Sequence, residues 1–255
     1  MTYYGTGGDE CHLPFNFQLI DEPWRAAAIA SAVQAYEAAL PPHGWPNWVL
    51  GNHDKSRIAS RVGLPQARVA AMLLLTLRGT PTLYYGDEIG MTDVPVPPNL
   101  LQNPWEVNVP GIGLGRDPVR TPMQWDASPH AGFTTGIPWL PVDQTAKDVN
   151  VAVERTDPHS MLSLYRELIR LRHTEEALIL GSYRPLPVTD DVMIYRRELR
   201  TRRLLVVLNF SAQPRLAGVQ ARGKILLSTG LDRWNERVDG ELKLLGNEGI
   251  VAELE

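Results

Sequence analysis

Residues 45–54 read Trp-Pro-Asn-Trp-Val-Leu-Gly-Asn-His-Asp, a short apolar run that ends in polar residues. We predict that residues 45–50 form a strand and that Pro65 opens a helix whose middle is almost continuously apolar. Gly79 ends this helix, and residues 82–85 form the next short strand. Strands that alternate with helices at this spacing indicate βα units and therefore a parallel sheet.

The segment before this stretch continues the same alternation. In residues 13–20 apolar side chains occupy every second position, which predicts a strand, although Pro14 cannot donate a ladder hydrogen bond. Asp21 and Pro23 suit the start of a helix, and the alanine-rich segment after them predicts a helix that ends at Leu40.

The segment after it changes character twice. Residues 92–157 are rich in proline and glycine and have no sustained period, which predicts a long loop of the kind that is usually functional. A helix is predicted from Asp157 to His173, because apolar residues recur on one face. From Leu180 the period is two, which predicts a small antiparallel sheet domain. Its strands are expected at residues 192–195, 204–210, 224–228, 242–245 and 250–254.

The composition excludes several classes of partner and cofactor. The 255 residues include 25 Lys and Arg against 29 Asp and Glu, so we expect neither a nucleic-acid nor an anionic-membrane partner. No apolar run approaches the ~20 residues that a membrane span needs. The single cysteine, Cys11, excludes a disulfide framework, and the six histidines lack metal-ligand spacing, so no metal or cofactor is expected.

Two short polar groups follow the predicted strands. His53 and Asp54 follow the strand predicted at residues 45–50, where a carboxylate beside an imidazole could form hydrogen bonds with adjacent hydroxyls of a sugar. The alternative is that Asn52-His53-Asp54 forms only a turn and a helix cap. Asp87 and Glu88 follow the next strand, and a turn with solvated carboxylates is the simplest interpretation of that pair. The alternative is a supporting role at the mouth of a barrel.

The predicted loop contains a third polar group, Arg116-Asp117-Pro-Val-Arg120-Thr-Pro-Met-Gln-Trp-Asp126. Its two arginines and two aspartates could form ion pairs that hold the loop in shape. They could equally bind the hydroxyls of a substrate. Surface ion pairs are common, so the sequence leaves both interpretations open.

Three longer stretches together carry a family resemblance. They are residues 48–57, residues 79–91, and residues 116–126 followed by residues 130–136. They resemble the α-glucosidase branch of the α-amylase superfamily, the family 13 glycoside hydrolases that include oligo-1,6-glucosidases. The resemblance implies a glycosidase that cleaves terminal α-glucosidic bonds of maltose, malto-oligosaccharides or isomalto-oligosaccharides with retention of configuration.

The resemblance also implies a fold. Members have a (β/α)₈ TIM barrel followed by an antiparallel all-β domain, which places this chain in the α/β class. Residues 1–178, including the long loop 92–157, correspond to the C-terminal part of the barrel, with strands six to eight and their helices. Residues 179–255 correspond to the antiparallel domain. Strands one to five are absent, so we expect a fragment whose partner is the missing N-terminal half of the barrel.

The same alignment assigns roles to individual residues. Asp54 matches the acidic residue that stabilises the transition state, and His53 and Arg120 match residues that bind the sugar. Trp125 and Phe133 are expected to form a wall of the pocket. The nucleophilic aspartate and the acid/base glutamate, which retaining enzymes hold about 5 Å apart, lie in the absent strands.

Three questions remain open at the level of sequence. A glucosyl-transferring isomerase, of the trehalose or sucrose type, carries the same motifs. A non-catalytic scaffold subunit, like the ancillary chains of amino-acid transporters, is the other alternative, and the presence of His53, Asp54 and Arg120 argues against it because a scaffold has no need of a sugar pocket. The residues after Met1 contain no signal peptide, so a cytoplasmic location is expected. Met1 falls where the family links strands five and six, so we also expect an internal start or a split gene.

Overall fold

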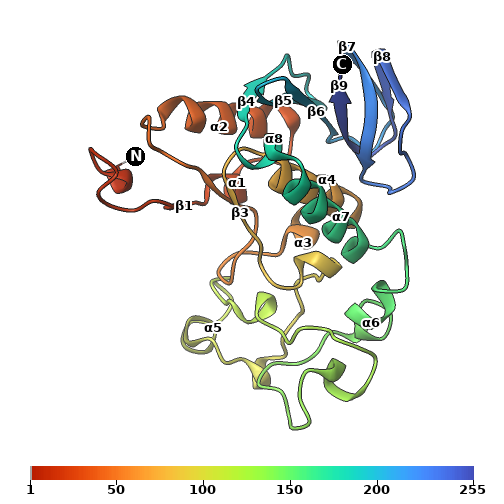
Figure 1. The fold of residues 1–255 in the computed structure, drawn as a ribbon. Helices are drawn as coiled ribbons and strands as arrows, with labels where there is room; N and C mark the ends of the chain where they lie inside the picture. The colour runs from red at the N-terminus through yellow and green to blue at the C-terminus, as the bar shows by residue number, and fades with distance from the viewer. Residues whose placement is uncertain (1) are drawn as a thin grey trace. The chain divides into compact units, whose positions relative to one another are not determined.

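The computed structural model describes residues 2–255 and divides into two compact units (Figure 1). We call them the sheet unit and the loop unit. The sheet unit comprises the residues up to Leu50 together with Pro65–Thr82 and Leu164–Glu255. The loop unit comprises Gly51–Leu64 and Leu83–Ser163. The expected internal start at Met1 lies outside the described residues, and the expected boundary at residue 178 remains a prediction.

The sheet unit contains the predicted parallel sheet. Its strands β1, β2 and β3 are adjacent in that order, and both pairings are parallel. The helix after β1 and the helix after β2 are the two βα crossovers that the sequence predicts. The bounds are Phe15–Asn16 for β1, Ala26–Ala39 for α2, Asn47–Val49 for β2, Leu64–Thr76 for α4 and Thr80–Thr82 for β3.

The first predicted strand is wrong over most of its length. Only Phe15 and Asn16 pair with β2, and Gln18–Asp21 forms the short helix α1. The Asn16 side chain accepts the backbone N–H of Gln18 at 3.0 Å, and this local hydrogen bond competes with the ladder. The following helix likewise begins at Ala26 instead of Pro23, because the residues before it are extended.

The predicted strand at residues 82–85 is shifted towards the N-terminus. β3 ends at Thr82, and residues 83–85 leave the ladder. The backbone N–H of Asp87 donates to the carbonyl of Tyr84 at 3.1 Å, which turns the chain. The hydroxyls of Tyr84 and Tyr85 bind loop carbonyls instead of facing a neighbouring strand. The apolar run therefore belongs to a turn because its tyrosines find polar partners.

The antiparallel sheet is confirmed, with six strands in the order β4-β5-β6-β9-β7-β8. Two parts of it were not predicted, namely β4 and the first half of β7. Around Gly218 the β7–β8 register shifts, and Gln220 has a φ of +41°, so the alternation that marks a strand is interrupted there. The bounds are Ser182–Pro185 for β4, Val192–Leu199 for β5, Arg202–Asn209 for β6, Arg215–Ser228 for β7, Arg237–Leu244 for β8 and Gly249–Leu254 for β9.

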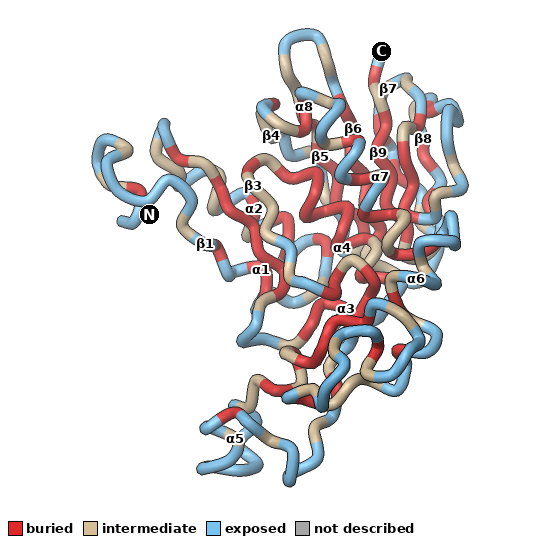
Figure 2. Tube along the Cα trace, turned by 60° about the horizontal axis from the view of Figure 1, so that its bottom comes forward, coloured by how far each residue is buried: buried red, intermediate tan, exposed pale blue. Residues whose placement is uncertain are grey.

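Helix α4 is almost entirely buried (Figure 2), which explains its nearly continuous apolar sequence. Its C-terminal carbonyls bind two arginines. Arg197 donates to the carbonyl of Thr76 at 2.6 Å, and Arg172 donates to the carbonyls of Leu75 and Leu77. Burial lowers the pKa of Arg197 to about 9. The two arginines satisfy carbonyls that every helix end leaves free. Arg172 belongs to α7, Met161–Thr174, which is followed by α8, Glu176–Ile179.

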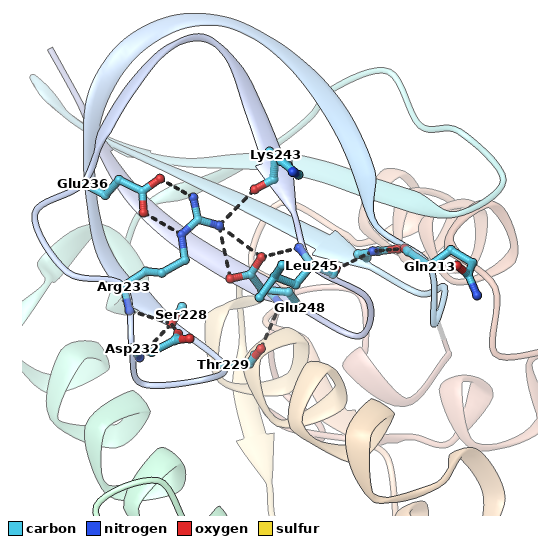
Figure 3. A network of polar contacts seen from close by, with 11 residues as sticks. Gln213, Ser228, Thr229, Asp232, Arg233, Glu236, Lys243, Leu245 and Glu248 are labelled. Carbon is cyan, nitrogen blue, oxygen red and sulfur yellow. Dashed lines mark hydrogen bonds and ion pairs between the residues drawn. The ribbon is translucent and has the colours of Figure 1, made fainter.

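A polar network holds the connection between β7 and β8 in place (Figure 3). The guanidinium of Arg233 donates to both oxygens of Glu236 and, at 3.1 and 3.2 Å, to both oxygens of Glu248. It also donates to the carbonyl of Lys243 at 3.0 Å. The two carboxylates raise the pKa of Arg233. These contacts stabilise the fold, and no sequence motif predicts them.

The loop unit consists of short elements, as its sequence predicts. Its described helices have five residues or fewer, apart from α4 and α7, of which only the ends belong to this unit. Its apolar core includes Ile89, Met91 and Met123. None of the helices within residues 2–255 combines the length and the apolar character that a membrane span requires. The helical elements of the loop unit are α3 Ile58–Val62, η2 Asp87–Ile89, η3 Pro98–Leu100, α5 Pro104–Asn108, η4 Asp117–Val119, η5 Pro129–Gly132, η6 Gln144–Lys147 and α6 Val151–Glu154.

The turn before β3 depends on one glycine. Gly79 has a φ of +118°, and an added Cβ would overlap the carbonyl oxygen of Pro46 and lie 2.9 Å from its Cβ. We expect Gly79→Ala to lower the free energy of unfolding by about 3–5 kcal/mol, because backbone strain and a clash act together. Gly113→Ala is the control, since its φ is +75° but nothing lies near its added Cβ, and it should cost only about 1 kcal/mol. Urea titration measures both, and equal losses would contradict the clash.

Candidate functional site

Asp54 is the centre of a charged cluster in the loop unit. Its Oδ1 lies 3.0 Å from Nη1 of Arg116, 3.2 Å from Nη2 of Arg120 and 3.2 Å from Nε2 of His53. All three contacts converge on one carboxylate oxygen. The Asp54 side chain is 36% exposed, so a ligand can still reach the carboxylate. The structure thus brings together the three residues that the sequence predicts, His53, Asp54 and Arg120, and adds Arg116.

Asn52 forms the turn that presents His53 and Asp54. Its side-chain oxygen accepts the backbone N–H groups of Asp54 at 2.9 Å and Lys55 at 3.0 Å. This is the hydrogen-bonding pattern of an Asx turn. The interpretation of Asn52-His53-Asp54 as a turn is therefore correct for Asn52, whereas the side chains of His53 and Asp54 take part in the charged cluster.

The segment 116–126, which we call the arginine-rich loop, is not held in shape by ion pairs among its own residues. Arg116 and Arg120 pair with Asp54, and Arg120 Nε also donates to the carbonyl of His53 at 2.9 Å. Asp117 is buried and accepts the backbone N–H groups of Gln102 and Asn103 at 2.6 and 2.8 Å. The sequence contained both arginines, but only the tertiary structure distinguishes the residues that meet Asp54 from those that hold the backbone.

A cavity of about 470 Å³ lies beside the cluster, and Arg120 contributes to both. Its walls are mostly apolar, a common character of small-molecule sites. Trp125 and Phe133 line it, as the resemblance implies. Further lining residues that sequence reasoning did not assign to a site are Tyr85, Glu88, Met123 and Trp139.

A left-handed turn holds the two predicted aromatic wall residues. His130 and Ala131 have φ values of +57° and +56°, a conformation that is costly for residues with a Cβ. The carbonyl of Ala131 accepts the backbone N–H of Trp125 at 2.9 Å, and Phe133 follows the turn directly. The turn therefore joins the beginning and the end of the segment that carries both rings.

The carboxylates after β3 are not both solvated, which corrects that part of the sequence analysis. Asp87 is only 3% exposed, and burial raises its pKa to about 7, although the nearby Arg57 guanidinium acts in the opposite direction. Glu88 is half-buried, lines the cavity, and accepts the backbone N–H of Gly86 at 2.7 Å. No alternation or motif distinguishes the buried carboxylate from its neighbour, because both lie within one turn.

A metal-binding arrangement is not found among the side chains of residues 2–255. No group of three or more His, Cys, Asp or Glu side chains in this range is arranged to hold a metal ion.

The family described as the alpha-amylase catalytic domain matches residues 2–181. An oligo-1,6-glucosidase of Parageobacillus thermoglucosidasius is 35% identical over 239 residues, covering 79% of this chain and 42% of that protein. The amino acid transporter heavy chain SLC3A1 of Homo sapiens is 35% identical over 265 residues, covering 99% of this chain and 37% of that protein. The chain therefore spans less than half the length of these curated relatives.

The fold is also similar to solved structures. A crystal structure of a trehalulose synthase MutB variant in complex with Tris has a TM-score of 0.88 and 30% sequence identity. The similar region covers 98% of this chain and 52% of that chain. Both the parallel sheet and the antiparallel sheet thus lie within the similar region.

Proposed function

Because the chain belongs to the alpha-amylase catalytic-domain family, we propose that it supplies the sugar-binding part of an α-glucosidase-type active site. One observation carries this proposal. The partly exposed Asp54 carboxylate pairs through Oδ1 with Arg116 and Arg120, and Arg120 also lines an aromatic-walled cavity. A polar anchor beside aromatic rings suits a sugar, which has hydroxyls at its rim and apolar faces.

The proposed roles follow from the chemistry of each group. The Asp54 carboxylate accepts hydrogen bonds from adjacent hydroxyls, and its charge stabilises an oxocarbenium-like transition state. His53 and Arg120 are donors that orient the same sugar. Trp125 and Phe133 pack against its apolar faces. The reaction is retaining cleavage of terminal α-glucosidic bonds in maltose or in malto- or isomalto-oligosaccharides.

We assign the nucleophilic aspartate and the acid/base glutamate to barrel strands outside these 255 residues. In this proposal β1, β2 and β3 are strands six to eight of a (β/α)₈ barrel, and the remaining strands are their partner. Phe15 and Phe17 support it, because they are 60% and 47% exposed in and next to β1, which among the described strands pairs only with β2. Their rings stack with centroids 5.7 Å apart, so an apolar surface is available there.

Two other functions have specific support. The similarity to a trehalulose synthase structure favours a glucosyl-transferring isomerase, in which a sugar replaces water as the acceptor. The similarity to an amino acid transporter heavy chain favours a non-catalytic scaffold. A scaffold has no need of a sugar site, so sugar binding separates it from both enzymes.

The test uses the purified 255-residue chain and p-nitrophenyl α-D-glucopyranoside. We expect ligand-observed NMR to detect binding, while absorbance detects no release of p-nitrophenol because the two reacting carboxylates are elsewhere. The β-anomer is the control and should bind more weakly. Light scattering reports whether the sample is monodisperse. A folded, monodisperse chain that binds neither anomer would contradict the sugar site and favour the scaffold.

A further inference from the structure

Arg57 is buried at a junction of three segments of the loop unit. Its side chain is 0% exposed, and its Nη1 and Nη2 donate to the carbonyls of Tyr85 at 2.6 Å and Val119 at 3.0 Å. The guanidinium also lies 4.9 and 4.8 Å from the ring centroids of Tyr84 and Tyr85. Arg57 therefore links the segment after β2, the turn after β3 and the arginine-rich loop.

The two tyrosines strengthen the same junction. The hydroxyl of Tyr84 donates to the carbonyl of Val119 at 2.9 Å, and that of Tyr85 donates to the carbonyl of Thr121 at 2.7 Å. These carbonyls flank Arg120 on both sides. The backbone from which Arg120 reaches Asp54 is thus held at two points by groups outside the ion-pair cluster, and one of these points is also bound by Arg57.

Asp87 lies behind Arg57. Its Oδ1 is 4.0 Å from Nη1 of Arg57, and within the described residues neither this oxygen nor Arg57 Nε has a hydrogen-bond partner. Its Oδ2 would lie 3.1 Å from a Cβ added to Gly51, so the carboxylate occupies the space beside the glycine that precedes the Asn52 turn. The charged groups that act on it are Arg57, Glu88 and Arg61. A buried carboxylate with one oxygen that lacks a hydrogen bond costs stability, so its presence calls for another reason.

We propose that Arg57, with Asp87 beside it, is a positioning residue that fixes Arg120 next to Asp54. The inference rests on the proposed function, because it assumes that this cluster binds the sugar. Arg57 holds the carbonyl next to Arg120, and the Asp87 carboxylate lies beside the guanidinium, 4.0 Å from its Nη1. The junction holds the backbone from which Arg120 reaches Asp54, and it is separate from the four residues that form the cluster.

The test compares variants of the 255-residue chain. Tyr84→Phe removes one hydrogen bond to Val119 and keeps the ring, and Asp87→Asn keeps the shape and removes the charge. Arg57→Lys keeps the charge and loses the two-carbonyl fork. We expect Tyr84→Phe and Arg57→Lys to weaken binding of p-nitrophenyl α-glucoside by roughly 5- to 20-fold, the loss that one to two hydrogen bonds produce. Asp87→Asn removes a charge and no hydrogen bond to Arg57, and it should weaken binding in the same direction. Asp148→Asn and Arg155→Met, at exposed positions of the same unit, should bind like the unmodified chain.

Asp87→Asn separates positioning from simple structural support. If the carboxylate merely supported the fold, the variant would lose stability and affinity together. Positioning predicts weaker binding without any loss of thermal stability at pH 8, where the buried carboxylate is charged in the unmodified chain. If Arg57→Lys does not fold, the binding and stability of Tyr84→Phe and Asp87→Asn still test the positioning role.

The pH dependence gives a second readout. In the unmodified chain, protonation of Asp87 below pH 7 releases its hold on Arg57, so affinity should fall from pH 8 to pH 6. Asp87→Asn retains every other titratable group, and the difference between the two curves reports Asp87. Near-normal affinity in folded Tyr84→Phe and Asp87→Asn, with binding lost in Asp54→Asn, would overturn the positioning role. Undiminished binding in Asp54→Asn would instead overturn the proposed function.

Discussion

Asp54→Asn is expected to weaken binding of p-nitrophenyl α-glucoside by at least tenfold. The side chain keeps its shape, but the negative charge between Arg116 and Arg120 is lost. A charge-assisted hydrogen bond contributes about 1.5–3 kcal/mol, which corresponds to roughly 10- to 100-fold in affinity. Isothermal titration or ligand-observed NMR with the 255-residue chain measures the change.

Three comparisons make this result specific. Asp148→Asn, at an exposed position of the same unit, should leave the affinity unchanged. Circular dichroism should show that Asp54→Asn remains folded, because the replaced side chain is 36% exposed. In a chain extended to the length of its relatives, the same change should lower kcat by about 10²- to 10³-fold, the usual effect of removing one electrostatic stabiliser. Full turnover there would refute the assignment of Asp54.

Asp87→Asn should stabilise the protein at pH 8 by up to about 4 kcal/mol, an upper bound from a shift of about three pKa units at ~1.4 kcal/mol each. Burial raises the folded-state pKa of Asp87 from 3.8 to about 7. Because the folded pKa lies above the unfolded one, the favourable contribution is complete below pH 4. It is lost as the pH rises through 7, where the folded state must bury a charge. Asparagine resembles the protonated form at every pH.

The measurement is urea unfolding of both proteins at intervals between pH 4 and pH 8. The free energies of unfolding should be similar at pH 4 and should diverge as the pH rises, because only the unmodified chain loses stability with this group. Asp148→Asn should show the pH dependence of the unmodified chain, since its carboxylate is exposed. Parallel curves for Asp87→Asn and the unmodified chain would show that Asp87 does not titrate between these limits.

Local patterns predicted those elements whose apolar period agrees with their final burial. The continuous apolar run of α4 corresponds to a buried helix, and the short apolar runs in β5, β6 and β9 correspond to strands that are buried over most of their length. Prediction failed where polar side chains bind partners outside the strand ladder. Asn16 begins a turn instead of extending β1, and Tyr84 and Tyr85 bind loop carbonyls instead of extending β3.

The candidate site was predictable only in part. His53, Asp54 and Arg120 are assigned by the family resemblance, and the structure places them together. The resemblance assigned no role to Arg116 or Arg57, and the simplest interpretation of Asp87 was a solvated carboxylate. Their functions depend on which carbonyls and carboxylates lie nearby, and those partners are up to 62 residues away in the chain.

The sequence by itself determined the family, the alternation of strands and helices, and the antiparallel sheet near the C-terminus, because these depend on short motifs and local periods. Only the tertiary structure decided that Asp117 holds backbone while Arg116 meets Asp54, and that Asp87 is buried beside Arg57. The physical reason is that burial and ion pairing are set by contacts between distant segments. A carboxylate has the same sequence signature whether it faces water, a backbone N–H or a guanidinium.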